Sequence, residues 1–377
     1  MEIALVKTSL KENERRVPIY PEYLGRFPES LRKRMVFEKG YGADYGYNDE
    51  YFIGHGAAVG GRDRIIKSCD IVVLPKPMRE DLELFEAGQV LFGWAHAVQQ
   101  TSITQLAIDR RMTIIAWEAM HLWSQSGDKI MHVFYKNNEL AGYAAVLHCL
   151  QVMGIDGYYG PRRKVVILSH GSVSRGAIYA LHGRGFNNIH VFTQRLPHNV
   201  PDQNPDVYYG HYYVSKVGTL MAMDSEGQER PLIDELATAD IICNGILQDT
   251  NRPIIFVREN EIGKLKPRSI IIDISCDEGM GFSFARPTGF DAPTFKVGEG
   301  ITYYSVDHTP SYLWSAASRE ISKALFQYLG IVADGETAWE SDPTIKRALE
   351  VKNGVVLNPN ILRFQRRHSR YPHKVGQ

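Results

Sequence analysis

Residues 164–177 read KVVILSHGSVSRGA, and this stretch decides the fold class. An apolar run that suits a buried strand turns at Ser169 and Gly171, then opens a helix that closes on Gly185. The next apolar run, NNIHVFTQR, ends at Arg195 and completes a βαβ unit of about 30 residues. A strand, a glycine-bearing turn, a helix and a strand in this order are typical of a dinucleotide-binding loop. Many such turns bind nothing, so the motif alone leaves a plain strand-turn-helix as the alternative.

The loop departs from the usual glycine pattern of such sites. Ser169 stands where the first glycine is usual, Gly171 holds the second place, and Gly176 follows inside the helix. Serine is small enough for the tight turn, and the N–H groups of the helix start suit a pyrophosphate. The hydroxyl groups of Ser172 and Ser174 can also donate to phosphate. The residues expected to bind a cofactor along this loop and at the end of the strand DIICNGI are Ser169, Gly171, Ser172, Val173, Ser174, Arg175, Asn244, Gly245 and Ile246.

The end of the second strand indicates which dinucleotide binds. In an NAD site this strand ends in Asp or Glu, which accepts from the ribose 2′-hydroxyl, whereas a 2′-phosphate needs a cation there. Here the strand ends with Thr193, Gln194 and Arg195 in place of the acid. A guanidinium can bind a phosphate through two parallel hydrogen bonds, and Arg175 offers a second contact. We therefore expect NADP(H); a solvated charge at the strand end is the alternative interpretation of Arg195.

The rest of the chain alternates apolar runs with helical stretches, which predicts an α/β fold with two Rossmann-like domains, parallel sheets and a cleft between them. Residues 1–138 and 308–377 form the expected substrate domain, and residues 139–307 form the expected NADP-binding domain. The expected strands of the first domain are EIALVK (2–7), MVFEK (35–39), DIVVLPK (70–76), VLFGWAH (90–96) and TIIAWEA (113–119), and the expected helices of the chain include 102–111, 139–154 and 311–332, with a polar excursion over 196–212.

Composition narrows the class of protein. Lys and Arg number 43 and so do Asp and Glu, and this balance argues against a nucleic-acid or anionic-membrane partner. The sequence shows neither a transmembrane run nor the apolar core of a signal peptide, so we expect a cytoplasmic protein. The four cysteines lack a CxxC spacing, and we expect free thiols rather than a disulfide or a metal site.

Three cations are expected at one edge of the first sheet. Lys76 ends the strand DIVVLPK and His96 ends VLFGWAH, and ligands of open α/β sheets bind at the carboxyl ends of the strands. Lys76 and His96 together could move protons near neutral pH. Arg16 follows the first strand and could bind a carboxylate, although the pattern alone favours an exposed loop charge. Lys76 and His96 could also be structural: the lysine could keep its ammonium group in water, and the histidine could belong to the core.

Two acidic residues complete this set. Glu118 ends the fifth strand, where it could hold a cation of the sheet edge or accept a proton. Asp277 follows the strand SIIIDISC in the second domain, where it could bind an ammonium group, orient water or cap a helix.

Seven stretches then occur in an order that resembles the superfamily of alanine dehydrogenases, transhydrogenases and saccharopine dehydrogenases. They are ENERRVPIYP, VVLPKPM, FGWAHA, AWEAM, IDISCDEGMGF, RPTGFDAPTF and YSVDHTPS, and they extend from residue 2 to about residue 330. Within the superfamily, SHGSVSRGA, VDHTPSYLWSAAS and the tail NPNILRFQRR resemble the NADP-dependent carboxyethylornithine synthases, which reductively join pyruvate to a side-chain amine.

The resemblance implies a role for individual residues. Arg16 would bind the carboxylate of a 2-oxo acid, Lys76 and His96 would hold the carbonyl oxygen and transfer protons, and Asp277 would lie near the nicotinamide. Asp307, His308 and Thr309 stand where the family usually has asparagine and methionine before its proline, and the added acid suits a cationic amino substrate.

The expected function is an NADPH-dependent reductive condensation of a 2-oxo acid with the amine of an amino acid such as ornithine or lysine. The alternatives are an alanine- or lysine-type amino-acid dehydrogenase, a saccharopine dehydrogenase, and a non-catalytic NADP-binding regulator. The expected partners are small-molecule substrates and further copies of the chain in a homo-oligomer, with no nucleic acid and no membrane.

Overall fold

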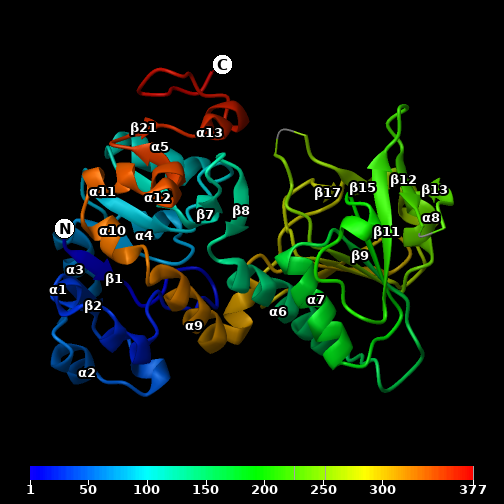
Figure 1. The fold of residues 1–377 in the computed structure, drawn as a ribbon, viewed down its shortest axis with the longest axis horizontal. Coiled ribbons are helices and arrows are strands. Elements are labelled where there is room, and N and C mark those ends of the chain that lie inside the picture. The colour runs from blue at the N-terminus through cyan, green and yellow to red at the C-terminus, as the bar shows by residue number, and fades with distance from the viewer. Residues whose placement is uncertain (225, 251, 377) are drawn as a thin grey trace. The chain divides into compact units, whose positions relative to one another are not determined.

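The computed structural model describes residues 1–224, 226–250 and 252–376 (Figure 1). The chain divides into two compact units. Unit 1 holds Met1–Tyr135 and the chain from Trp314 onward, and unit 2 holds Lys136–Leu313. Residues 136–138 and 308–313 therefore lie in unit 2, whereas the sequence-based boundaries gave them to the first domain. The roles expected of the two domains stay predictions.

Unit 1 is built on a sheet whose central strands are parallel, as the continuous apolar runs predict. Its strand order is β21-β20-β6-β5-β4-β1-β2-β3. The strands are β1 (Ile3–Leu5), β2 (Met35–Glu38), β3 (Ala58–Gly60), β4 (Ile71–Val73), β5 (Val90–Gly93), β6 (Thr113–Ala116), β20 (Leu349–Lys352) and β21 (Val355–Val356), beside a separate hairpin of β7 (His121–Trp123) and β8 (Lys129–His132).

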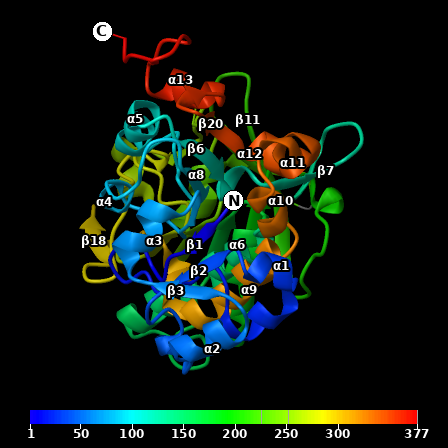
Figure 2. The same cartoon turned by 90° about the vertical axis from the view of Figure 1, so that its left-hand side faces the viewer.

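Helices cover both faces of this sheet, which is why its strands are apolar on both sides. The helices are α1 (Glu29–Arg32), α2 (Asp49–Gly54), α3 (Arg62–Ser68), α4 (Arg79–Leu82), α5 (Thr101–Asp109), α9 (Trp314–Leu325), α10 (Leu329–Ala333), α11 (Glu336–Ser341), α12 (Pro343–Ala348) and α13 (Pro359–Phe364). Ile3 and Leu5 face a core shared with α9–α12, while Ala4 and Val6 face a core shared with α3 and α5. Figure 2 shows these two groups of helices on opposite sides of β1.

Unit 2 is built on a second, larger sheet of order β13-β12-β11-β10-β9-β14-β16-β19-β18. Its strands are β9 (Val165–Leu168), β10 (Ile189–Thr193), β11 (Val207–Val214), β12 (Leu220–Met223), β13 (Glu229–Pro231), β14 (Ile241–Asn244), β16 (Ile270–Asp273), β18 (Thr294–Val297) and β19 (Ile301–Tyr304), beside a separate pair of β15 (Ile255–Val257) and β17 (Gly281–Phe282). Helices α6 (Tyr135–Met153) and α7 (Ser172–Gly183) share a core with one face of the sheet, and α8 (Leu232–Ala237) shares a core with the other.

The α/β class with two largely parallel sheets is confirmed, and the sheet edges correct the expectation of wholly parallel sheets. In unit 1, β20 pairs antiparallel with β6. In unit 2, β12 pairs antiparallel with both β11 and β13, and β18 pairs antiparallel with β19. The expected polar excursion over 196–212 is wrong from residue 207 onward. There the run VYYGHYYV forms β11, because aromatic and β-branched residues favour a half-buried strand.

The expected single helix over 311–332 is also corrected. A 3-10 turn at Thr309–Leu313 precedes α9, and the helix is interrupted between Leu325 and Leu329 before α10 begins. The interruption lets Tyr328 and Leu329 bury their side chains in the same core as Leu325. Burial of these apolar groups offsets the loss of one helical turn.

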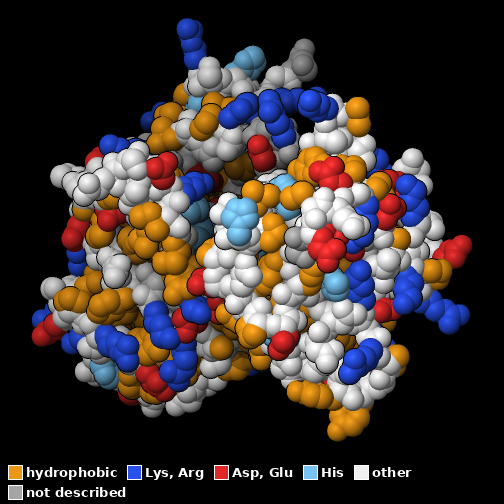
Figure 3. Space-filling model, turned by 45° about the vertical axis from the view of Figure 1, so that its right-hand side comes forward, with side chains coloured by type: hydrophobic (Ala, Val, Ile, Leu, Met, Phe, Trp, Pro, Cys, Tyr) orange, Lys and Arg blue, Asp and Glu red, His pale blue; other side chains and the backbone are white. Residues whose placement is uncertain are grey.

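The surface carries both signs of charge, as the zero formal net charge predicts. Figure 3 shows acidic, basic and apolar side chains intermixed over one face. In the described part of the chain, the helices all lack the combination of length and apolarity needed to cross a membrane.

Candidate active site

The four expected residues of unit 1 follow neighbouring parallel strands. β6, β5, β4 and β1 are adjacent, so their carboxyl ends lie at one edge of the sheet. Lys76 and His96 both adopt left-handed backbone conformations there, with φ of 42° and 46°. This conformation is costly for residues other than glycine and is concentrated at functional sites. The backbone therefore marks the same two residues as the sequence does.

Glu118 links these residues through its carboxyl group. Its Oε1 accepts a hydrogen bond from the backbone N–H of His96 at 2.5 Å. Its Oε2 is buried and makes no hydrogen bond within the described residues. Burial and the nearby Glu350 raise the pKa of Glu118 well above its usual value, while the charge of Lys76 lowers it. Lys76, His96 and Glu118 thus belong to one electrostatic cluster.

Arg16 is buried, so the interpretation as an exposed loop charge is wrong. Its side chain is 3% exposed, and its Nε and one terminal nitrogen donate to Glu14 at 2.8 and 2.5 Å. Its guanidinium also lies 5.1 Å from the ring centre of Trp94, two residues before His96. A pair of this kind holds the guanidinium rigidly at the carboxyl ends of β1 and β5. Sequence reasoning missed Glu14 and Trp94, and only the charge alternation in ENERR hinted at the first.

In unit 2, the loop between β9 and α7 has the form that the sequence predicts. Ser169 has a φ of 80°, a conformation that explains why glycine is usual at its position. Gly171 is the N-cap of α7 and has no side chain, so the N-cap residue offers no side-chain acceptor to the first N–H groups of the helix. Gly176 serves packing instead: a Cβ there would lie 1.8 Å from the backbone oxygen of Glu139 in α6.

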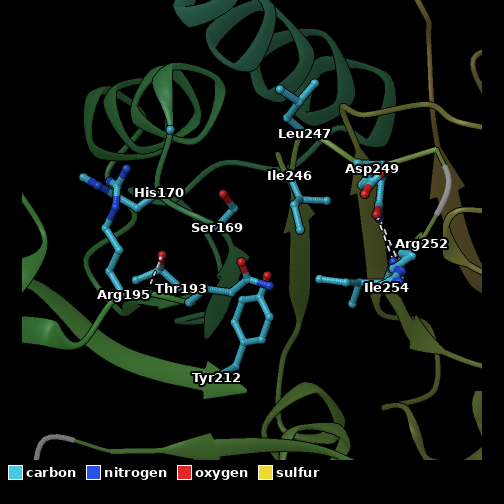
Figure 4. A pocket seen from close by; sticks show the side chains of 13 residues that line it. Ser169, His170, Thr193, Arg195, Tyr212, Ile246, Leu247, Asp249, Arg252 and Ile254 are labelled. Carbon is cyan, nitrogen blue, oxygen red and sulfur yellow. Dashed lines mark hydrogen bonds between the residues drawn. The ribbon is translucent and has the colours of Figure 1, made fainter. Parts of the chain in front are cut away.

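A cavity of about 460 Å³ opens at the carboxyl ends of β9, β10 and β14. Figure 4 shows that Ser169, Thr193 and Arg195 approach it from one side, and that Ile246, Asp249 and Arg252 lie on the other. The lining comprises Ser169, His170, Gly171, Thr193, Gln194, Arg195, Tyr212, Ile246, Leu247, Gln248, Asp249, Arg252 and Ile254. Six of the expected cofactor residues are thus brought together: Ser169, Gly171, Thr193, Gln194, Arg195 and Ile246.

The other expected cofactor residues lie outside this lining. Ser174 is fully buried, and its hydroxyl lies where a Cβ on Gly245 would be 2.6 Å away, so it faces β14 and cannot donate to a phosphate in the cavity. Asn244 is fully buried too, and its side chain donates to Asp273 at 2.9 Å. Arg175 forms an ion pair with Asp202 at 3.3 Å. Ser172 and Val173 begin α7 beside the cavity.

The remaining expected residues lie in unit 2. Asp277 is half-buried after β16, in a turn closed by a hydrogen bond from Met280 to its backbone oxygen. Asp307 and His308 contact each other at 2.6 Å, and the His308 side chain is buried. Sequence reasoning missed the buried Asp273, whose pKa burial raises to about 6. Tyr303 and Asn244 both donate to it, so Asp273 links the carboxyl ends of β14, β16 and β19.

Most of the chain matches two domains of one known protein family. Residues 5–141 match the family described as alanine dehydrogenase/PNT, N-terminal domain, and residues 161–359 match alanine dehydrogenase/PNT, C-terminal domain. The chain belongs to the alanine dehydrogenase/PNT family. The expected superfamily is thereby confirmed, and with it the expectation of an oxidoreductase.

Two relatives of this family member cover most of its length. An N(5)-(carboxyethyl)ornithine synthase of Clostridium botulinum is 27% identical over 343 residues, 86% of this chain and 95% of that protein. An alanine dehydrogenase of Methanococcus maripaludis is 24% identical over 370 residues, 93% of each chain.

Solved structures of the family share the fold. An L-alanine dehydrogenase has a TM-score of 0.76 at 20% identity and covers 97% of this chain and 99% of its own. A transhydrogenase of Sinorhizobium meliloti has a TM-score of 0.67 at 18% identity and covers 95% and 99%.

Proposed function

We propose that this chain uses NADPH to join a 2-oxo acid to the amine of an amino acid, giving an N-(1-carboxyalkyl) amino acid. The observation that carries the cofactor assignment is the end of β10, where Thr193, Gln194 and Arg195 line the cavity of unit 2 in place of an acid. A carboxylate at this position would repel a 2′-phosphate, whereas a guanidinium attracts it.

The residues of the cavity fit a dinucleotide. A Cβ on Gly171 would meet no atom within 4 Å, so the backbone at the start of α7 is open to a ligand. The uncapped N–H groups of this helix suit the pyrophosphate, and the volume is in the range of ligand cavities. When bound, NADPH supplies the hydride that reduces the carbon–nitrogen double bond.

The residues of unit 1 supply binding and proton transfer. Arg16 uses two of its nitrogens to hold Glu14 and has a further N–H group for the carboxylate of the oxo acid. Lys76 and His96 move protons as the amine adds to the carbonyl and water leaves. Glu118 fixes the backbone of His96 and takes the role of the partner of the sheet-edge cations.

The choice of amine donor is argued from one relative and from Asp307. The name of the Clostridium relative places a carboxyethyl group on N5 of ornithine, which is a side-chain amine nitrogen. Asp307 adds an acid that suits a cationic amino acid, and we assign it and His308 to substrate binding. Asp277 is assigned to the neighbourhood of the reacting carbon.

Incubation with NADPH, one 2-oxo acid and a panel of diamino acids tests the proposal. The oxo acids are pyruvate, glyoxylate and 2-oxoglutarate, and mass spectrometry detects the adduct. We expect a product whose mass is the sum of both substrates less one oxygen atom, formed as NADPH is consumed. Absence of turnover with every pair would favour a non-catalytic NADP-binding protein.

A second candidate is an amino-acid dehydrogenase that uses ammonia, which the alanine dehydrogenase relative favours. Pyruvate and ammonium alone would then consume the reduced cofactor as fast as any diamino acid does. A saccharopine-type reaction would appear instead as a preference for 2-oxoglutarate with lysine.

A further inference from the structure

His170 and Arg195 line one corner of the cavity in unit 2, and Arg175, which is outside the lining, lies close enough for its charge to act on His170. His170 follows the strained Ser169 at the end of β9, Arg175 lies in the first turn of α7, and Arg195 follows β10. His170 is 5% exposed and lines the cavity. Figure 4 shows the side chain of Arg195 extending toward His170. The ring of His170 stands edge-on to Tyr209, with centroids 5.3 Å apart, which fixes its orientation.

This corner has hydrogen-bonding groups without partners. Nε2 of His170 and Nε of Arg175 are both buried and make no hydrogen bond within the described residues. The carboxylate that pairs with Arg175 belongs to Asp202, whose side chain is 77% exposed. Buried polar groups are nearly always paired in folded proteins, and a site for an ion is one explanation of the exceptions. The corner therefore suits an anion with several acceptor oxygens.

The position of the corner distinguishes two kinds of phosphate. A pyrophosphate would lie on the N–H groups at the start of α7, near Gly171. The corner lies instead toward the end of β10, where Thr193 and Arg195 occupy the place that contacts the ribose 2′ position in dinucleotide sites. A phosphate monoester with two negative charges matches two guanidinium groups and one imidazole.

We propose that His170 is a specificity-determining residue that binds the 2′-phosphate of NADP(H) together with Arg175 and Arg195, and that it takes up a proton when this phosphate binds. This inference rests on the proposed function, because it concerns the same cofactor. It goes further in assigning a role to a residue that stands between Ser169 and Gly171 of the loop.

The charges around His170 account for the proton uptake. Burial, followed by the charges of Arg175 and Arg195, lowers the pKa of His170 to about 4, and Asp202 acts weakly in the opposite direction. Tyr209, on β11, contributes a neutral ring. The imidazole is therefore neutral at neutral pH in the free protein. A phosphate dianion opposes the two guanidinium charges and favours the imidazolium, so binding draws a proton from solvent.

Calorimetric titration of the full chain with NADP⁺ and with NAD⁺ tests the inference. At pH 7.5 the 2′-phosphate, with a second pKa of about 6, is already a dianion, so a proton taken up on binding comes from the protein side. Measurement in two buffers of different ionisation enthalpy gives the number of protons. We expect uptake of a substantial fraction of a proton with NADP⁺ and none with NAD⁺.

His170→Gln keeps a donor at the ring position and cannot become charged. We expect this variant to lose the proton uptake and to bind NADP⁺ about tenfold more weakly, with NAD⁺ affinity changed less than about twofold. His182→Gln is the matched control, because Nε2 of His182 is also buried and has no hydrogen-bond partner among the described residues, but lies at the other end of α7. The control should bind both cofactors as the parent does.

The outcomes separate this inference from the proposed function. If the parent chain prefers NADP⁺ but takes up no proton, or if His170→Gln weakens NAD⁺ and NADP⁺ equally, the role of His170 is overturned while the cofactor assignment stands. If the parent chain binds NAD⁺ as tightly as NADP⁺, the cofactor assignment itself fails. The proton count in the parent chain needs no variant, so a variant that does not fold leaves the test intact.

Discussion

At the scale of single residues, backbone conformation and sequence mark the same positions. Lys76, His96 and Ser169 each follow a strand and adopt a left-handed conformation that only glycine adopts without cost. Strained backbone of this kind is concentrated at functional sites, which makes these residues candidates for mutation. Arg195 is marked differently, by the absence of an acid at the end of β10.

Replacement of Lys76 by Met tests its role in proton transfer. We expect Lys76→Met to lower kcat at least about 100-fold, the usual effect of removing an acid–base group, while NADPH affinity changes little. Steady-state kinetics and a separate binding titration measure the two effects. Lys129→Met, on the exposed strand β8, is the control and should keep full activity. Loss of cofactor affinity and of turnover together would mean that Lys76 is structural.

Replacement of Arg195 by Ala tests the assignment of the cofactor. Loss of a charge-assisted contact to phosphate should weaken NADPH about 10- to 100-fold and leave NADH nearly unchanged. Fluorescence titration with both cofactors gives the ratio. Arg184→Ala, whose side chain pairs with Asp156, is the matched control in the same unit. An equal loss for both cofactors would refute a phosphate contact at Arg195.

At the scale of elements, an irregular strand brings a carboxyl group to the edge of the first sheet. The pairing of β20 with β6 shifts register between Leu349 and Val351, and Glu350 lies at this bulge. Glu350 is 4% exposed, its Oε1 accepts from Asn358 at 3.0 Å, and its Oε2 is buried without a partner among the described residues. Glu350, which is distant from Glu118 in the sequence, thereby raises the pKa of Glu118.

The buried carboxyl group of Glu350 predicts that the stability of the folded protein depends on pH. Burial raises the pKa of Glu350 to about 7. The stability that the protonated carboxyl gives the folded protein is therefore fully present below the pKa of this group in the unfolded chain, and it is lost as the pH rises through 7. Glu350→Gln cannot ionise, and its oxygen still accepts from Asn358. We expect this variant to be more stable than the parent at pH 8 by about 1 to 3 kcal/mol, with little difference at pH 5.

Urea denaturation at pH 5 and pH 8 measures this difference, with the exposed Glu86→Gln as the control. A variant that is destabilised equally at both pH values would show that Glu350 is ionised in the folded protein.

The elements also show how far sequence reasoning reaches. Continuous apolar runs such as 70–76 and 164–169 predict their strands, because burial on both faces leaves a local signature. The short strands β20 and β21 leave no such signature, since LEVKNGVV is half polar and gains its order by pairing with β6. The contacts of Arg16 with Trp94, and of Glu118 with Glu350, depend on topology and could not be predicted from spacing.

At the scale of the whole molecule, the two units have separate cores. The apolar cores of unit 1 draw on residues 3–134 and 321–361, and those of unit 2 draw on residues 143–306. Because these sets do not overlap, unit 2 contains the apolar contacts that stabilise its own fold.

This separation predicts that the fragment 136–313 folds alone. We expect a cooperative thermal transition by circular dichroism, and binding of NADP⁺ within about tenfold of the full chain, without turnover. A fragment without a cooperative transition would show that unit 2 needs unit 1 for its stability. The complementary chain, which lacks 136–313, serves as the comparison and should not bind the cofactor.

The return of the chain to unit 1 at Trp314 has a consequence for biosynthesis. Unit 2 is complete once residue 313 has left the ribosome, whereas β6 gains its neighbour β20 only when residues 349–352 emerge. Until then β6 presents a bare edge that other nascent chains could pair with. Chaperone dependence during translation should accordingly be concentrated in the half of the molecule that is begun first and finished last.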